Sequence, residues 1–351
     1  MTRAYAAQSP TSGLAPWSLD RREPRPDDVS IEILYCGVCH TDLHYAENDW
    51  GATRYPVVPG HEIVGRVTAV GPDVRRFEPG MVVGVGCLVD SCRSCSACER
   101  GLENYCEAGM VPTYGGRDRH DGTMTYGGYS EGIVVSERFV VRVPDALEPA
   151  QAAPLLCAGI TTYSPLRVLG VKAGDRVGVV GMGGLGHMGI KFARSMGAEV
   201  TLFTRSESKI AEAKCNGADR VVVSTQPEAM KAAAESLDYV LDTAPVDHDV
   251  NPYMACLVLD GTYVIVGQMT PLDPPVQTRQ LVLRRRSLMG SLIGGMPETQ
   301  EVLDYCAETG VRCDIEVIRM EDINEAYARM KRSDVRYRFV IDMASLKGEA
   351  A

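Results

Sequence analysis

A glycine-rich turn between a predicted strand and a predicted helix constrains the fold of this chain most strongly. Val177–Val180 is an apolar run typical of a buried strand, and residues 187–196 have the composition of a helix that Gly197 ends. Between them lies Gly-Met-Gly-Gly-Leu-Gly (181–186), and a second strand is expected at Glu199–Phe203. A strand, a Gly-x-Gly-x-x-Gly turn, a helix and a strand form the unit that binds a dinucleotide. The sequence therefore predicts a Rossmann nucleotide-binding domain.

The glycines of this turn have separate physical tasks. Gly181 makes the tight turn, Gly183 lets the backbone approach a pyrophosphate, and Gly186 lets the helix pack closely on the strand. The pyrophosphate then lies at the helix N-terminus, where backbone N–H groups are free to donate. We expect cofactor contacts from Gly181, Gly183, Gly184, Leu185 and Gly186.

Strands and helices continue to alternate after this unit. Strands are predicted at Arg220–Val223, Tyr239–Leu241 and Tyr263–Val266, and helices at Ile210–Ala218, Ala229–Ser236 and Met254–Leu257. Such alternation predicts an α/β domain with a doubly wound parallel sheet.

The residues after the second strand indicate which dinucleotide is bound. NAD enzymes place an acid about 20 residues after the turn, where it binds the ribose 2′-hydroxyl. Here the strand ends in Thr204, Arg205 and Ser206, with Lys209 beyond. Hydroxyls and two cations suit a 2′-phosphate, so we predict NADP(H). Glu207 is the dissenting residue, because it could reach a ribose if the loop were shifted, and an ordinary solvated charged turn is the other alternative.

Length and composition limit the class of protein. The 351 residues suggest about two domains, and the net charge of −10 argues against a nucleic-acid partner. The start of the chain has no apolar signal-peptide core, and no apolar run suggests a membrane span. Twelve cysteines in such a chain indicate thiols and metal ligands rather than disulfides, so a cytoplasmic location is expected.

The two ends of the chain have a different texture. Up to about residue 150, short alternating runs such as Val29–Tyr35 and Ile63–Val70 are separated by Gly and Pro, which suggests an antiparallel barrel or sandwich. After about residue 290, helices are expected at Pro297–Thr309 and Asp322–Lys331, followed by a strand at Tyr337–Ile341. We expect this tail to return to the first domain.

Four closely spaced cysteines predict a structural zinc site. Cys92, Cys95 and Cys98 recur at three-residue intervals, and Cys106 follows. Four thiolates at this spacing can close a tetrahedral zinc site around a loop. Coincidence is improbable, and an Fe–S cluster is the less favoured alternative because thiolates also hold such clusters.

A second group of candidate ligands is spread over three segments. Residues 36–44 contain Cys36, Cys39, Thr41 and several histidines, residues 61–62 are a His followed by a Glu, and Cys157 precedes the glycine-rich half of the chain. Three nitrogen or sulfur ligands from separate segments leave a fourth position open, which is the pattern of a catalytic zinc. A Thr near a His can also pass a proton.

With these motifs, the chain resembles the zinc-dependent medium-chain alcohol dehydrogenases, and within them the cinnamyl-alcohol-dehydrogenase-like branch that includes bacterial NADPH-dependent aldehyde reductases. The matching stretches cover nearly the whole chain: 36–44, 59–65, 92–106, 127–130, 155–165, 181–191, 290–295 and 334–342. The resemblance implies a GroES-like β-barrel catalytic domain made of residues 1–155 and 292–351, with both zinc sites, around a Rossmann NADP-binding domain of residues 156–291.

The resemblance also assigns roles to single residues. It implies that Cys39, His61 and Cys157 bind the catalytic zinc, that Cys36 is a buried packing thiol, and that Glu62 either approaches the metal or hydrogen-bonds around it. Asp42 is expected near the metal. Thr41 and His44 match the proton relay of the family, and a helix N-cap is the alternative role for Thr41. Further cofactor contacts implied are Thr161, Thr243, Gly267, Ser291 and Ile293.

Other residues are assigned less specifically. His120 and His248 are expected in surface loops. Trp50, Met296 and Pro297 fall near pocket positions of the family, although Trp50 could equally pack in the core. The polar segment 110–125 has no family pattern and could shape the pocket entrance or an interface. A homodimer is expected from the resemblance.

The function predicted is reversible hydride transfer between NADP(H) and primary alcohols or aldehydes, with zinc as a Lewis acid and aromatic or allylic aldehydes as the favoured substrates. Two alternatives remain: an NAD-dependent polyol or secondary-alcohol dehydrogenase, and a non-catalytic redox sensor that binds zinc and a nucleotide.

Overall fold

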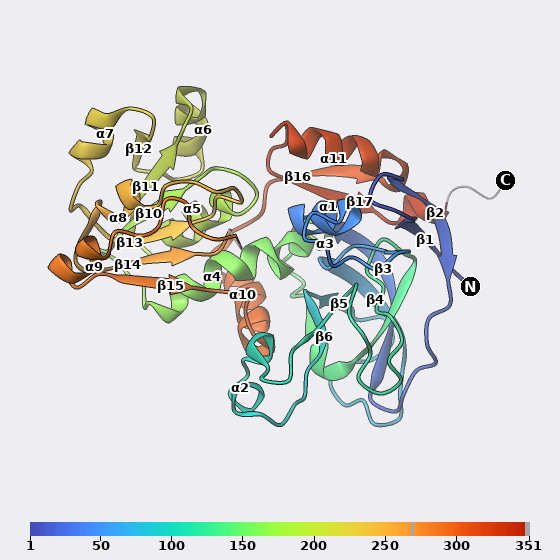
Figure 1. Cartoon of the computed structure of the whole chain (residues 1–351). Helices are drawn as coiled ribbons and strands as arrows, with labels where there is room; N and C mark the ends of the chain where they lie inside the picture. The colour runs from blue at the N-terminus through green and yellow to red at the C-terminus, as the bar shows by residue number, and fades with distance from the viewer. Residues whose placement is uncertain (268–269, 348–351) are drawn as a thin grey trace. The chain divides into compact units, whose positions relative to one another are not determined.

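The computed structural model describes residues 1–267 and 270–347, and these residues divide into two compact units (Figure 1). Unit 1 comprises Met1–Ile160 and Gly294–Ala351, and unit 2 comprises Thr161–Ile293. The last four residues of the predicted segment 292–351 lie outside the described residues. Across the described part of the chain, no helix is both long enough and apolar enough to cross a bilayer.

Unit 2 contains a six-stranded parallel sheet with the strand order β12-β11-β10-β13-β14-β15 (Figure 1). Its strands are β10 (Arg176–Val180), β11 (Glu199–Thr204), β12 (Arg220–Val223), β13 (Leu237–Asp242), β14 (Leu257–Ile265) and β15 (Ser287–Gly290). The order reverses between β10 and β13, as in a doubly wound fold. Its central strands are nearly continuous apolar runs because helices cover a parallel sheet.

Helices connect these strands. They are α5 (Gly186–Ser195), η4 (Glu207–Lys209), α6 (Ile210–Cys215), α7 (Pro227–Ala232), α8 (Asn251–Met254) and α9 (Thr278–Arg284), while α4 (Ala158–Val168) leads into the unit. The doubly wound parallel sheet predicted from the sequence is therefore confirmed.

Some predicted elements of unit 2 are misplaced. The helix predicted at Met254–Leu257 is wrong, because α8 lies earlier and Leu257 already begins β14, where it pairs with Leu237. Pro252 favours this earlier helix start, since proline has no N–H to leave unpaired in the first turn. The helix predicted to reach Ser236 ends at Ala232. The edge strand β15 was not predicted, because it is short and mostly exposed.

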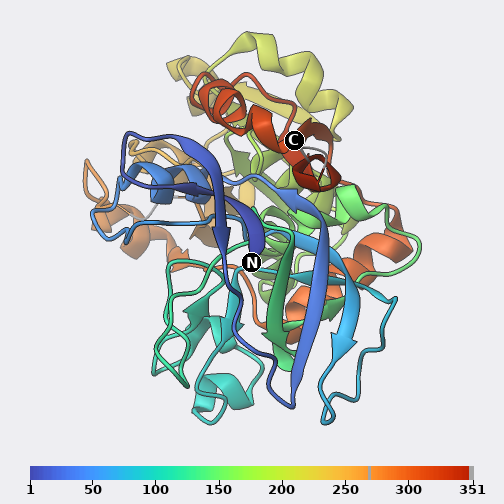
Figure 2. The same cartoon turned by 90° about the vertical axis from the view of Figure 1, so that its right-hand side faces the viewer.

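Unit 1 is built on a seven-stranded sheet with the order β16-β17-β3-β4-β5-β9, in which β8 also pairs with β3. Figure 2 shows β3 in blue beside β8 in green. The strands are β3 (Asp28–Gly37), β4 (Ile63–Val70), β5 (Val82–Val85), β8 (Gly132–Ser136), β9 (Val141–Arg142), β16 (Ile315–Arg319) and β17 (Arg338–Asp342). Every pair is antiparallel except β16 with β17.

Smaller elements complete unit 1. They are the hairpin β1 (Thr2–Ala7) and β2 (Leu14–Leu19), the pair β6 (Leu88–Asp90) and β7 (Val111–Pro112), and the helices α1 (His40–Glu47), α2 (Ser96–Glu99), η1 (Glu103–Tyr105), η2 (Glu137–Phe139), α3 (Pro149–Ala152), η3 (Ala153–Leu156), α10 (Met296–Thr309), η5 (Met320–Asp322), α11 (Ile323–Lys331) and α12 (Ala344–Lys347).

The last strand lies beside the strand that leads to the first candidate ligand. Ile341 of β17 pairs with Cys36 of β3, three residues before Cys39. The tail therefore reaches the N-terminal sheet, as expected, and brings β17 to the metal-ligand region.

The polar loop 110–125 is fastened to the N-terminal segment. The guanidinium of Arg25 pairs with Asp118 at 2.8 Å and with Asp121 at 3.0 Å. Burial alone would raise the pKa of Asp118, but the hydrogen bond and charge of Arg25 outweigh this and lower it to about 2. The carboxylate therefore stays charged, and the loop is anchored within unit 1.

Candidate metal and nucleotide sites

Four residues from three segments of unit 1 form a buried cluster of metal-binding groups. The donor atoms of Cys39, His61, Glu62 and Cys157 all lie within 4.8 Å of one another. The Sγ atoms of Cys39 and Cys157 are 3.9 Å apart, and His61 Nε2 is 3.3 Å from the Cys157 sulfur. The structure thus gathers groups that the sequence separates by up to 118 residues.

The cluster fits a tetrahedral zinc ion. Bond lengths of about 2.3 Å to sulfur and 2.0–2.1 Å to nitrogen place neighbouring ligand atoms roughly 3.5–3.8 Å apart. The observed separations of 3.9 and 3.3 Å are close to that spacing. Glu62 Oε2 is buried and has no hydrogen-bond partner among the described residues. An orphaned carboxylate oxygen beside two thiols and an imidazole is what a cation would satisfy.

Asp42 positions the imidazole of this cluster. Its fully buried carboxylate accepts hydrogen bonds from the backbone N–H groups of Cys39 at 2.9 Å and Gly60 at 3.0 Å, and from the Tyr129 hydroxyl at 3.2 Å. It also lies 3.2 Å from His61 Nδ1. A proton on Nδ1 facing this carboxylate leaves the Nε2 lone pair directed at the thiols, which is the tautomer that a metal needs. Asp42 therefore lies beside the candidate metal ligands, as expected.

The two thiols of the cluster are not equivalent. Their contact lowers the pKa of Cys39 well below its usual range and raises that of Cys157. Hydrogen bonding between the two sulfurs is the leading cause, because one proton is then shared between them. A thiolate is therefore already favoured at Cys39, and a thiolate is the form that binds metals.

A buried arginine faces Glu62 from the far end of the chain. Arg338 of β17 donates from its guanidinium to Glu62 Oε1, and both side chains are at most 5% exposed. Burial raises the pKa of Glu62 to about 7, and the positive charge of Arg338 opposes that rise. Arg338 was not predicted from the sequence, because no local pattern links residues 276 positions apart.

The predicted relay residues lie on α1. Cys39, and not Thr41, precedes the helix as its N-cap residue, so the alternative role of Thr41 as an N-cap is wrong. His44 lies one turn further on with 30% of its side chain exposed, and its Nδ1 is 2.7 Å from Asp49 Oδ2. Asp49 was not predicted from the sequence, although its position five residues after His44, just past the helix end, could have suggested the contact.

Aromatic rings connect the outside of unit 1 with this cluster. The Trp50 ring lies 5.1 Å from that of His44 and 5.5 Å from Tyr45. Tyr45 contacts Tyr114, whose ring stacks on His61 at 5.6 Å. Trp50 is 46% exposed, so the alternative that it packs in the core is wrong.

Met296 and Pro297 contact the cysteine-rich loop. The Met296 N–H donates to Glu103 at 2.9 Å, and the ring of Pro297 would obstruct a side chain at Gly101. Both line a cavity of about 270 Å³ that Cys98 also lines. The contacts of these two residues therefore include the loop of the second cysteine cluster.

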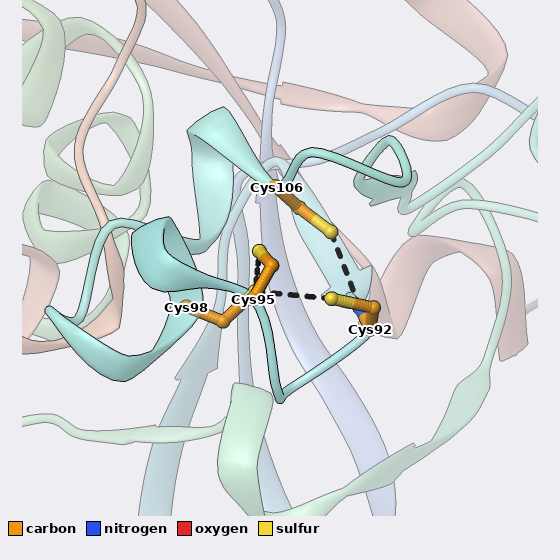
Figure 3. Close-up of side chains that lie close together, drawn as sticks. All are labelled: Cys92, Cys95, Cys98 and Cys106. Atoms are coloured by element: carbon orange, nitrogen blue, oxygen red, sulfur yellow. Dashed lines mark hydrogen bonds between the residues drawn. The ribbon is translucent and has the colours of Figure 1, made fainter.

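The four cysteines of the loop form the second cluster of the described residues (Figure 3). The Cys98 sulfur is 3.9 Å from that of Cys92 and 3.5 Å from that of Cys95, and the Cys92 N–H donates to the Cys106 sulfur at 3.3 Å. All four donor atoms lie within 4.8 Å of one another. Four converging sulfurs fit a closed tetrahedral site, which has no position left for a substrate.

In unit 2 the glycine turn has the geometry predicted for it. Gly181 has a φ of 88°, which only glycine adopts without strain. A Cβ on Gly186 would lie 2.1 Å from the Gly181 carbonyl oxygen, so helix and turn touch there. A Cβ on Gly183 would meet nothing within 4 Å, which leaves open space in front of the turn. The turn thus fits an approaching pyrophosphate.

Two further predicted cofactor residues lie beside this turn. The Thr243 hydroxyl donates to the Val180 carbonyl at 2.7 Å and lies next to Gly181 and Gly186. Gly267 packs against the backbone of Thr243. Of the other predicted cofactor residues, Gly184 and Leu185 belong to the turn, and Thr161 is buried in α4. The Ser291 N–H donates to the Ile265 carbonyl at 3.1 Å, and Ile293 is the last residue of unit 2.

The segment after β11 presents one unpaired cation. Arg205 is exposed, and no hydrogen bond or ion pair holds it among the described residues, whereas Lys209 pairs with Glu212 at 3.0 Å. The Ser206 hydroxyl is 2.7 Å from that of Ser208, and Thr204 is buried at the strand end. Glu207 accepts a hydrogen bond of 2.8 Å from Gln226, so the dissenting carboxylate already has a partner.

Comparison with known proteins agrees with this geometry. Residues 25–145 match the family described as alcohol dehydrogenase GroES-like domain, and residues 184–308 match zinc-binding dehydrogenase. The chain is 54% identical to aldehyde reductase YahK of Escherichia coli, covering 98% of this chain and 97% of that protein. It is 50% identical to NADP-dependent alcohol dehydrogenase C 1 of Mycolicibacterium smegmatis, covering 98% of each.

Solved structures give the same result. A cinnamyl alcohol dehydrogenase from Sorghum bicolor superposes with a TM-score of 0.96 at 45% identity, covering 100% of this chain and 99% of that one. A cinnamyl alcohol dehydrogenase from Helicobacter pylori, solved with NADP(H), gives 0.91 at 39% identity and 98% coverage of each. This chain belongs to the zinc-dependent medium-chain alcohol dehydrogenases, in the cinnamyl-alcohol-dehydrogenase-like branch. The predicted family and its GroES-like and Rossmann folds are confirmed.

Proposed function

We propose that this chain is a zinc-dependent oxidoreductase that transfers hydride reversibly between NADP(H) and primary alcohols or aldehydes, with aromatic and allylic aldehydes as its substrates. The observation that carries the proposal is the buried group of Cys39, His61, Glu62 and Cys157 in a chain that also has a dinucleotide-binding turn. The relatives named as aldehyde reductase, NADP-dependent alcohol dehydrogenase and cinnamyl alcohol dehydrogenase support it.

Two zinc sites are proposed per chain. Cys39, His61 and Cys157 hold the catalytic ion, with Glu62 beside it, and Cys92, Cys95, Cys98 and Cys106 hold the structural ion. When bound, the catalytic zinc supplies a Lewis acid for the substrate oxygen, and NADP(H) supplies or accepts the hydride. The two sites belong to the GroES-like domain proposed for residues 1–155 and 292–351, and residues 156–291 form the Rossmann domain.

Thr41 and His44 are the proposed proton-handling residues. The Thr41 hydroxyl gives or takes a proton at the substrate oxygen, and His44 exchanges protons with solvent through its exposed edge. The contact between His44 Nδ1 and Asp49 supports this role, because the carboxylate orients the ring.

The 2′-phosphate of NADP(H) is proposed to bind between Arg205, Lys209, Thr204 and Ser206. The exposed, unpaired guanidinium of Arg205 supports this, since a phosphate forms charge-assisted hydrogen bonds with it. The remaining proposed cofactor contacts are Thr161, Gly181, Gly183, Gly184, Leu185, Gly186, Thr243, Gly267, Ser291 and Ile293.

Arg205→Ala is expected to raise the KM for NADPH by about ten- to a hundredfold and to leave that for NADH nearly unchanged. The reason is that the ribose hydroxyl of NADH gains nothing from the guanidinium charge. Steady-state kinetics with both cofactors measure the effect. The control is Arg194→Ala, which removes an exposed arginine at the C-terminal end of α5, away from the glycine turn. Equal changes for both cofactors, or better use of NADH by the wild type, would favour the NAD-dependent alternative and Glu207 as the ribose ligand.

Cys98→Ser is expected to lower the zinc content from two ions per chain to one and the melting temperature by several degrees. Cys98 is buried and its sulfur contacts two of the other three, so losing it opens a site whose metal contributes folding energy. Metal analysis and thermal unfolding test this. A variant that keeps two zinc ions and full stability while losing activity would contradict the structural role.

The substrate class is tested by one kinetic screen. The loss of NADPH absorbance is followed with aromatic, allylic and aliphatic aldehydes and with a polyol-derived ketone. Highest kcat/KM with cinnamyl-type aldehydes is the expected result. Turnover restricted to the ketone would favour a polyol dehydrogenase, and no turnover with bound zinc and nucleotide would favour a redox sensor.

A homodimer in the cytoplasm is proposed as the working form. Support for the dimer comes from unit 2, where Val282 and Leu283 of α9 and Leu288 of the edge strand β15 are 77%, 59% and 39% exposed. Exposed apolar side chains beside an unpaired strand edge are typical of an interface. Support for the cytoplasm comes from twelve cysteines that are all free. Light scattering on the purified protein measures the assembly.

A further inference from the structure

His248 lies in an electrostatic setting that the sequence did not suggest. It follows β13 but is not a fully exposed loop residue, because only 19% of its side chain is accessible. Its Nδ1 is 2.9 Å from the Val246 carbonyl oxygen, and its Nε2, which forms no hydrogen bond among the described residues, is 3.3 Å from Asp242 Oδ2. The Asp242 carboxylate is fully buried. One ring therefore lies between a buried carboxyl group and the backbone of residues 243–249, which are called the β13 loop below.

The β13 loop begins at the edge of the sheet where the glycine turn lies. Asp242 is level with Val180 of β10, which is level with Phe203 of β11. Thr243, the first residue of the loop, hydrogen-bonds to Val180 and contacts the glycine turn. In a doubly wound sheet the nucleotide lies outside the carboxyl ends of the strands where the order reverses, which here is between β10 and β13. The β13 loop thus borders the nucleotide crevice.

The two contacts of His248 are both attractive only when the ring is positively charged. A neutral imidazole carries one N–H and one lone pair. If the proton is on Nδ1, the lone pair of Nε2 faces a carboxylate at 3.3 Å. If it is on Nε2, the lone pair of Nδ1 faces a carbonyl oxygen at 2.9 Å. Only the imidazolium presents N–H groups to both acceptors.

Two further hydrogen bonds hold the carboxyl group of Asp242. Its carboxylate accepts hydrogen bonds from the Tyr263 hydroxyl at 3.0 Å and the Ala244 N–H at 3.1 Å. The contact with Asp242 is the leading cause that raises the pKa of His248, with burial opposing it and the Val246 carbonyl and Asp247 adding to the rise. On the other side of His248, the Tyr253 ring lies 5.7 Å from the His248 ring and 5.3 Å from the Phe203 ring. Burial raises the pKa of Tyr253, and the positive charge of Arg205 opposes this rise without outweighing it.

We propose that His248 is a positioning residue for the adenosine part of NADP(H): as an imidazolium it fixes the β13 loop to Asp242, and its deprotonation weakens cofactor binding. The proposal rests on the proposed function, because it requires a nucleotide in this crevice. The packing from His248 through Tyr253 to Phe203, at the end of β11, joins the β13 loop to the strand end that precedes Arg205. The aldehyde chemistry needs no group of this loop. The protonation state of His248 is therefore expected to change the affinity for the cofactor and not the rate with saturating cofactor.

The sign of the pH effect follows from the protonation state of His248 that holds the loop. Because the charged ring is the form that holds the loop, wild-type affinity is full below the pKa of His248 and falls as the pH rises through it. His248→Gln has no such proton. It is expected to bind NADP⁺ and 2′,5′-ADP about tenfold more weakly than wild type at pH 6 and with a similar affinity at pH 9. The ionisation of the 2′-phosphate is common to both proteins and cancels in the ratio of their dissociation constants.

The test is calorimetric titration of the zinc-loaded protein with 2′,5′-ADP, NADP⁺ and 5′-AMP between pH 6 and pH 9. His120→Gln, which removes an exposed histidine of unit 1, is the matched control and should behave as wild type. His248→Arg, which is charged at every pH, is expected to restore affinity and to keep it at pH 9. The KM for NADPH should rise in His248→Gln while kcat stays unchanged.

A wild type that binds 2′,5′-ADP no better than 5′-AMP would contradict the NADP(H) preference of the proposed function and not the role of His248. A ratio of dissociation constants that is below two or independent of pH would overturn the role of His248. Should His248→Gln fail to fold, NMR of the six wild-type histidines decides instead. By linkage, one histidine pKa above the usual range must rise further when 2′,5′-ADP binds, and no such rise would overturn the proposal.

Discussion

Replacing His61 or Cys157 with alanine is expected to lower kcat/KM for aldehyde reduction by about a thousandfold or more, while NADPH still binds. Each residue supplies one donor atom of the proposed three-ligand zinc site, and a Lewis acid is worth several kcal/mol in the transition state. The cluster lies in unit 1 and the glycine turn in unit 2, so the dinucleotide keeps its own contacts. Turnover, zinc content and NADPH fluorescence titration measure the three quantities separately.

Cys215→Ala is the matched control for Cys157→Ala, because it removes an exposed thiol of unit 2 that belongs to neither cysteine cluster. It should retain two zinc ions and full activity. Near-normal turnover in His61→Ala or Cys157→Ala would show that this cluster is not the catalytic zinc site. Loss of NADPH binding together with turnover would instead indicate that the variant has unfolded.

The parts of the fold and site that the sequence predicted are those with a local pattern. The glycine turn is recognisable because three glycines at fixed spacing satisfy three separate steric needs, and Gly181 and Gly186 meet them in the structure. The four cysteines are recognisable because their short spacing closes one loop. For the proposed catalytic cluster, the candidate residue types could be found in the sequence, but the choice of Cys39 over Cys36 came from the family resemblance.

The parts that could not be predicted depend on contacts between distant segments or on short elements. Helix and strand compete in short apolar runs, so the boundary between α8 and β14 was misplaced. The residues around His248 have the composition of a surface loop, and only the folded structure shows that His248 lies beside the buried Asp242. Arg338 is an ordinary strand residue in the sequence, and the pairing of β17 with β3 is what brings it to Glu62.

The pair of Glu62 and Arg338 shows what such a distant contact does for the site. A buried carboxylate loses hydration, and here a buried guanidinium compensates for one of its two oxygens. Gly37 makes room for the pair, since a Cβ at that position would lie 1.9 Å from Glu62 Oε2. Without the arginine, the carboxylate would stay buried beside two thiols and would lose the guanidinium charge that compensates for its burial.

Arg338→Met is therefore expected to lower the free energy of unfolding by about 3–5 kcal/mol, which is the usual effect of removing one partner from a buried ion pair. Adding Glu62→Gln is expected to recover part of that loss, because a neutral amide has no charge left to balance. Urea unfolding of the single and double variants at equal zinc content measures both changes and their coupling. A double variant less stable than Arg338→Met alone, or a loss below about 1 kcal/mol in Arg338→Met, would mean that Glu62 relies on the metal and not on Arg338 for its compensation.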